Sequence, residues 1–176
     1  MQIKNTEYRF GLVAISFHWI MAVLVIGLLA LGLYMVGMPI SLEKLKFYGW
    51  HKEYGILVLI LVIFRLWWRL INITPRLDMP LVEVFAARAV HWAFYGFMIA
   101  MPLTGYLMTS AAGLPPSFFG LFTLPNLIAP DPVYKHLLKE IHEWLGYALI
   151  ATIALHTAAA LKHHFIDKDT ILKRML

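Results

Sequence analysis

Five of the eight histidines of this chain lie within or at the edge of long apolar segments, and they are His18, His51, His91, His142 and His156. An ionisable side chain inside a membrane segment is costly and marks a functional site by default. One such histidine is more often a helix contact than a ligand, but five in a chain of 176 residues indicate a common purpose. Imidazole is the commonest metal ligand in proteins, so metal binding is the chemistry that these residues suggest.

The segments that must position these histidines cover residues 13–36, 49–71, 88–111 and 136–161. The chain is 61% hydrophobic and only 14% charged, which indicates that its solvent is a lipid bilayer. Each segment is long enough to cross a hydrocarbon core of about 30 Å, and prolines and glycines separate the segments. We therefore expect an all-α membrane protein, a single domain over residues 1–176, in which four transmembrane helices form an up-down-up-down bundle.

The net charge of +5 follows the ends of the segments, so nucleic acid is not an expected partner. Ten cations gather at one set of ends: Lys4, Arg9, Arg65, Arg69, Arg76, Arg88, Lys162, Lys168, Lys173 and Arg174. The other set has five: Lys44, Lys46, Lys52, Lys135 and Lys139. The positive-inside rule then puts both termini in the cytoplasm, with residues 112–135 forming an outer interfacial connection. Residues 1–12 are expected to be retained, because the first apolar run has no signal cleavage site.

The spacing of the histidines predicts two sites at different depths. His142 and His156 are fourteen residues apart, which is about 21 Å along a helix and within roughly 40° of one face. Because alternate spans run in opposite directions, His51 is expected to be level with His142. His156 is then level with either His18 or His91, so one helix serves an outer and an inner pair.

Opposed imidazoles from two helices are suited to the axial positions of an iron porphyrin in a bundle core. The absence of cysteine excludes c-type haem attachment, thiolate metal sites and cysteine-ligated iron–sulfur clusters. Bare zinc or iron sites usually add carboxylates, and here Glu53, Glu140 and Glu143 lie toward the outer edge with none beside His156. Two non-covalently bound haems are therefore the expected cofactors.

Small residues help to choose between the two inner candidates, because a porphyrin needs space beside its ligand. Alanine or glycine stands four residues after four of the histidines, at Ala22, Gly55, Gly146 and Ala160. His91 is instead followed by Tyr95. We therefore favour His18 as the partner of His156, with His51 pairing with His142. His91 is expected to be a neighbour of the ligands or of a propionate, or alternatively an ordinary interfacial histidine.

Four sequence segments carry a family resemblance: F-H-W-I at 17–20, W-H-K-E-Y-G-I-L-V-L at 50–59, K-E-I-H-E at 139–143 and A-L-H-T-A-A-A-L-K-H-H-F at 154–165. With these segments in this order, the chain resembles the bacterial di-haem cytochrome b561 family from about residue 8 to its C-terminus. The resemblance implies two haem b groups, one held by His18 with His156 and one by His51 with His142.

The resemblance also implies a superoxide:ubiquinone oxidoreductase, in which superoxide is oxidised at the outer face and ubiquinone is reduced. The five outer lysines would attract the superoxide anion, or alternatively anchor the span ends at the headgroups. His163 and His164 with Lys162 would supply hydrogen bonds and protons to the quinone, unless they form only a basic helix end. One alternative is an electron conduit between quinone and a periplasmic redox partner. Another is a non-catalytic haem-binding or structural membrane protein. The sequence predicts neither further catalytic residues nor an oligomeric state.

Overall fold

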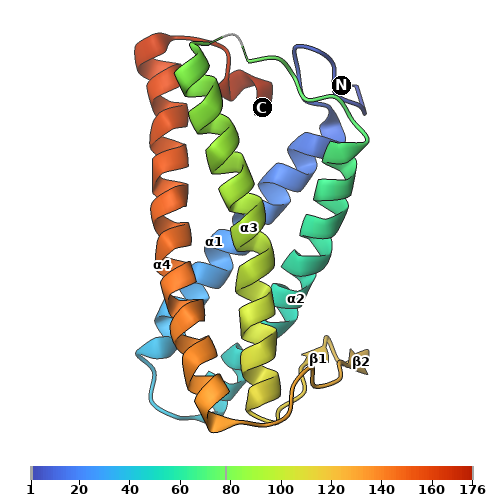
Figure 1. Ribbon diagram of the computed structural model, residues 1–176, viewed down its shortest axis with the longest axis vertical. Coiled ribbons are helices and arrows are strands. Elements are labelled where there is room, and N and C mark those ends of the chain that lie inside the picture. The colour runs from blue at the N-terminus through green and yellow to red at the C-terminus, as the bar shows by residue number, and fades with distance from the viewer. Residues whose placement is uncertain (1, 78, 176) are drawn as a thin grey trace.

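Four long helices form most of the computed structural model, which describes residues 2–77 and 79–175. They are α1 (Leu12–Val36), α2 (Leu42–Leu70), α3 (Leu81–Ala111) and α4 (Pro132–Lys162). They run alternately in opposite directions, so both termini lie at one end of the molecule (Figure 1). A π-helix, His163–Asp167, extends α4, and a 3-10 helix, Leu172–Met175, follows it. Within the described chain, three helices are long and apolar enough to cross a membrane, namely α1, α3 and α4 with its extension.

The helix α2 differs from the other three in its charge. It is 29 residues long, but lysines and glutamates occupy its first turns, and Arg65 and Arg69 lie near its end. The expectation of four transmembrane helices is therefore confirmed by length and composition for three of them. A membrane-spanning role for α2 is part of the proposal below.

Three helices begin earlier than the apolar segments predict: α2 at Leu42, α3 at Leu81 and α4 at Pro132. Capping groups explain two of these starts. The Ser41 side chain accepts a hydrogen bond from the Lys44 backbone N–H at 3.1 Å, and the Asp131 carboxylate accepts from the Val133 N–H at 2.7 Å. An apolar run marks only the part of a helix suited to hydrocarbon, whereas the helix itself continues through polar turns up to its cap.

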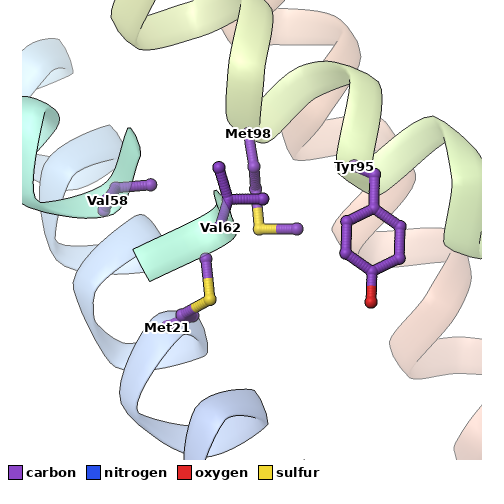
Figure 2. Packing of buried hydrophobic residues seen from close by; sticks show 5 residues of the cluster. All are labelled: Met21, Val58, Val62, Tyr95 and Met98. Carbon is purple, nitrogen blue, oxygen red and sulfur yellow. The ribbon is translucent and has the colours of Figure 1, made fainter. Parts of the chain in front are cut away.

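The main cluster of buried apolar residues involves only three of the four helices. Met21 of α1, Val58 and Val62 of α2, and Tyr95 and Met98 of α3 form one apolar cluster (Figure 2). The closest packing is between helices adjacent in sequence, α1 with α2, α2 with α3, and α3 with α4. The only buried residue of α4 is Leu149. The helix that carries two of the predicted ligands is therefore held mainly by α3.

The connection between α3 and α4 contains a short antiparallel hairpin, β1 (Ser117–Phe118) with β2 (Phe122–Thr123), which the sequence did not predict. Its turn has positive φ at Phe119 (51°) and Gly120 (70°), as a type I′ turn requires. The Phe119 N–H donates to Glu53 Oε1 at 3.1 Å, which fixes the hairpin beside α2 at the end of the molecule opposite the termini (Figure 1). We call this end the hairpin end, and the other the terminal end.

The terminal end is closed by contacts between segments distant in sequence. The Asn5 amide donates to Ile73 O at 2.7 Å, the Arg76 N–H donates to Glu7 O at 2.9 Å, and the Trp19 indole donates to Met175 O at 2.7 Å. The N-terminal segment, the α2–α3 connection and the C-terminal segment thus meet at one end.

Candidate functional site

The helices bring the predicted histidines together at two levels. At the hairpin end, the rings of His51 (α2) and His142 (α4) have centroids 6.2 Å apart. We call these two the hairpin-end pair. At the terminal end, the rings of His18 (α1) and His156 (α4) are 6.3 Å apart. His91 (α3) joins them, with its ring 5.9 Å from that of His156, and the three form the terminal-end cluster.

These separations fit a metal held between two imidazoles. A histidine nitrogen binds a transition metal at about 2.0 Å, so two opposed rings on one metal have centroids about 6 Å apart. Direct imidazole–imidazole hydrogen bonds are not recorded for any of these histidines within the described chain. The ring separation in each pair is therefore the one expected for two axial imidazoles on a single metal.

Thr104 of α3 determines which nitrogen of His142 is free. The Thr104 hydroxyl donates to Met101 O at 2.9 Å, so its oxygen is left to accept. His142 Nδ1 lies 3.0 Å from that oxygen and must carry the proton. The lone pair of His142 is then on Nε2, and metal-binding histidines are commonly oriented by such a partner on their other nitrogen.

Two glycines give the hairpin-end pair its room. A Cβ atom at Gly32 of α1 would lie 3.4 Å from His51 Cε1, and one at Gly105 of α3 would lie 3.3 Å from His142 Cε1. A side chain at Gly105 would therefore press on the ring, and one at Gly32 would only touch it. His51 Nδ1 is buried and has no hydrogen-bond partner among the described residues. A buried polar atom without a hydrogen bond lowers the stability of the fold by about 1–3 kcal/mol. A bound ligand that contacts this atom could offset the loss.

The space beside the predicted ligands also suits a large planar group. A Cβ at Gly55, four residues after His51, would meet no other atom within 4 Å. At Gly146, four residues after His142, the nearest atom would be Met101 Cε at 3.8 Å. The donor set and the open positions beside it fit a haem better than a bare ion.

At the terminal end, ring distance alone does not separate His18 from His91 as the partner of His156. The neighbours of the two rings do differ. Tyr95, one turn after His91, is only 6% exposed and occupies the core, whereas Ala22, one turn after His18, is small. The pairing of His18 with His156 remains our proposal, with His91 as a close neighbour.

The residues expected to bind quinone lie at the terminal end and are partly engaged with acidic groups. Lys162 pairs with Asp167 at 2.6 Å and with Glu83 at 3.5 Å. His163 Nδ1 lies 2.7 Å from a carboxylate oxygen of Asp169. His164 Nδ1, in contrast, is buried and has no hydrogen-bond partner within residues 2–77 and 79–175.

A bare-metal alternative finds support only away from the histidine pairs. In the described part of the chain, the one close group of three potential ligands is His163, Asp167 and Asp169. Lys162 already balances the charge of Asp167 there. Glu53 binds the hairpin, Glu140 pairs with His136 and Glu143 accepts from Tyr147, so these glutamates serve other contacts.

The five lysines predicted to lie on the outer side are at the hairpin end, and their contacts differ. Lys44 donates to Met38 O at 2.6 Å, and Lys46 lies over the Trp50 ring at 4.9 Å. Such contacts suit side chains that anchor a helix end. For Lys52, Lys135 and Lys139, residues 2–77 and 79–175 provide no ion pair.

Sequence reasoning missed several residues around the histidines. Thr104, Gly32 and Gly105 act across helix interfaces, and nothing in their local sequence indicates the partner. Arg65 and Arg69 were counted as charges at a span end, but they follow Val58 and Val62 at helical spacing on the core side of α2. That spacing was a signal that the sequence offered. Without these two arginines, eight cations remain at the predicted cytoplasmic ends of the helices against five at the other ends. The count still favours cytoplasmic termini.

Comparisons with known proteins place this site in context. A family model described as prokaryotic cytochrome b561 matches residues 9–176. Cytochrome b561 homolog 2 of Escherichia coli (strain K12) is 38% identical, covering 100% of this chain and 95% of the relative. Cytochrome b561 homolog 1 of the same organism is 36% identical over 72% of each chain. A protein of Yersinia pestis named probable superoxide oxidase CybB is 32% identical, again over 72% of each chain.

Proposed function

Because this chain belongs to the prokaryotic cytochrome b561 family of haem-binding membrane electron-transfer proteins, we propose that it carries electrons from the outer face of the bacterial inner membrane to ubiquinone. The proposed protein is a four-span bundle that includes α2, with both termini in the cytoplasm and two haem b groups. The observation that carries the proposal is the presence of two histidine pairs at opposite ends of α4, with ring separations of 6.2 and 6.3 Å.

The proposed axial ligands are His51 with His142 at the outer level, and His18 with His156 at the inner level. A haem bound at each level supplies a one-electron iron(III)/iron(II) couple. The protein contributes the ligand geometry, the proton position on His142 and an apolar wall that keeps water out. These tasks require residues from all four helices, which explains why a short chain can serve two cofactors.

The proposed electron donor is superoxide. Two superoxide ions each lose one electron to become oxygen, and one ubiquinone gains two electrons and two protons to become ubiquinol. Lys52, Lys135 and Lys139 make no ion pair with the described residues, so their charge is available to attract an anion. The relative named probable superoxide oxidase supports this donor at 32% identity.

The proposed quinone position is the terminal end, beside the π-helix. His164, whose Nδ1 has no partner in the described part of the chain, is suited to donate to a quinone carbonyl oxygen. His163, held by Asp169 at 2.7 Å, is suited to supply a proton. Lys162 then acts through charge balance with Asp167 rather than as a direct donor.

Stopped-flow mixing of the oxidised protein with superoxide tests this function. We expect rapid haem reduction that superoxide dismutase abolishes, that slows as salt is added, and that is followed by ubiquinol formation when ubiquinone is present. Absorbance in the haem α-band and in the quinone band follows the two halves of the reaction. Slow, salt-independent haem reduction by superoxide, together with rapid reduction by ubiquinol, would instead identify a conduit to a periplasmic redox protein.

A further inference from the structure

Two arginines occupy positions on α2 that continue the buried stripe of the bundle. Val58 and Val62 are 3% and 0% exposed, and Arg65 and Arg69 follow at steps of three and four residues. This spacing places all four on one face of the helix. Arg65 and Arg69 are partly buried themselves, so two cations lie where apolar residues are expected.

The recorded partners of these guanidinium groups are neutral. Arg65 Nη1 lies 4.0 Å from Met21 Sδ, and the Arg65 guanidinium lies 5.7 Å from the centre of the Tyr95 ring. The Arg69 guanidinium lies 5.5 Å from the same ring and 5.6 Å from the Trp92 ring. Aromatic faces attract cations, but they do not neutralise them.

An anion is needed to complete this arrangement. Among residues 2–77 and 79–175, no carboxylate lies within ion-pair distance of Arg65 or Arg69. Two like charges four residues apart on one helix repel each other, and a buried charge without a counter-ion is strongly disfavoured in an apolar bundle. The described residues do not supply this negative charge, and a bound group that carries carboxylates would supply it.

The position of Arg65 indicates which group this is. Arg65 contacts Met21, which lies one turn after His18 on α1. Arg69 lies over the ring of Trp92, the residue that follows His91 on α3. A haem held at this level brings two propionate carboxylates, which are suited to planar guanidinium donors.

We propose that Arg65, supported by Arg69 and by the Tyr95 ring between them, binds the propionates of the haem in the terminal-end cluster and sets its reduction potential. This inference rests on the proposed function, because it requires a haem at that level. It makes the two arginines positioning residues for the cofactor. The hairpin-end pair has no equivalent cation among its recorded contacts, so the effect should be confined to one haem.

Redox titration of the full-length protein carrying Arg65→Gln tests the inference. Loss of the positive charge should favour the oxidised form of the terminal-end haem by about tenfold at a fixed potential, which is about 59 mV for a one-electron couple. The hairpin-end haem should keep its potential. His142→Ala and His156→Ala identify which spectral component belongs to which level. Arg65→Lys should restore most of the potential, because it retains the charge.

Arg88→Gln is the matched control, since it removes an exposed cation from α3 near the same end of the bundle. It should leave both potentials unchanged. Loss of the terminal-end haem in Arg65→Gln but not in Arg65→Lys also supports the proposal. Unchanged potentials with two haems retained, equal shifts at both haems, or haem loss in both Arg65 variants would overturn it. A His156→Ala protein that retained two haems would instead refute the ligand assignment before any arginine was changed.

Discussion

The hairpin-end pair and the terminal-end cluster share one helix, but they are built differently. His51 and His142 lie beside glycines and a threonine, and their recorded neighbours are uncharged. His18, His91 and His156 lie near Arg65 and Arg69, which have no recorded carboxylate partner in the described chain. Partly buried arginines thus accompany the imidazoles at the terminal end, whereas the cations at the hairpin end are the lysines in the first turns of α2 and α4.

This difference shows how α4 can serve two sites with different surroundings. A positive surrounding favours the reduced, less positive form of a bound iron porphyrin, and a neutral one does not. The terminal-end haem should therefore have the higher potential before its propionates are counted. Electrons would then move from the hairpin end toward the terminal end, which is the direction that the proposed reaction requires.

The largest expected effect distinguishes His18 from His91 as the ligand that pairs with His156. His18→Ala should remove one of two haems, because His18 is the proposed partner of His156 at the inner level. His91→Ala should retain both haems, because its ring is a neighbour and not a ligand in this account. Haem content per chain, measured after purification in detergent, distinguishes the two variants. The reverse pattern, with haem lost only from His91→Ala, would transfer the ligand role to His91.

A smaller effect should follow from removing the partner of His142. Thr104→Val takes away the oxygen that accepts from Nδ1, and changes of this kind typically weaken a metal site by about 10–100-fold. Titration of haem into the haem-depleted protein measures the affinity at the hairpin end. Thr104→Ser retains the hydroxyl and should bind haem as the wild-type protein does. Equal weakening in both variants would attribute the effect to packing and not to the hydrogen bond.

Replacing Gly105, which lies beside the hairpin-end pair, should have a milder effect on the same site. Gly105→Ala places a Cβ 3.3 Å from the His142 ring, so the ring must shift and haem affinity at the hairpin end should fall by about threefold to tenfold. Gly96→Ala, on the same helix, meets no atom within 4 Å and should leave haem binding unchanged. It should even stabilise the helix by about 0.5–1 kcal/mol. Identical haem affinities in the two variants would show that the close approach has no role.

The smallest expected effect concerns the lysines at the hairpin end. Replacing Lys52, Lys135 and Lys139 by Gln should slow haem reduction by superoxide by about twofold to tenfold at low salt and flatten its dependence on ionic strength. Haem spectra should not change. Lys46→Gln is the control, because Lys46 is already engaged over the Trp50 ring. An unchanged rate in the triple variant would assign these lysines to membrane anchoring.

The closeness of His51 to His142, and of His18 and His91 to His156, could be predicted from the sequence because it depends on regular quantities. A constant rise per residue fixes the depth of His142 and His156, and alternating helix direction then fixes which residues are level with them. The family assignment was also confirmed, on motifs that surround these histidines. The choice between His18 and His91 was harder, because both start at the same depth and both rings approach His156.

Other features could not be predicted because they depend on contacts between segments distant in sequence. Thr104 is recognisable only once α3 and α4 are packed, and the hairpin is held by Glu53 of another helix. The π-helix His163–Asp167 is accompanied by contacts of Asp167 with Lys162 and of Asp169 with His163. Arg65 and Arg69 are a different case, since their spacing from Val62 was visible in the sequence.

The number of haems per chain in His142→Ala and His156→Ala tests the central claim most directly. The account predicts two haems in the wild-type protein and one in each variant, with different components of the reduced spectrum lost in the two cases. Retention of both haems in either variant, or a single haem in the wild-type protein, would contradict it.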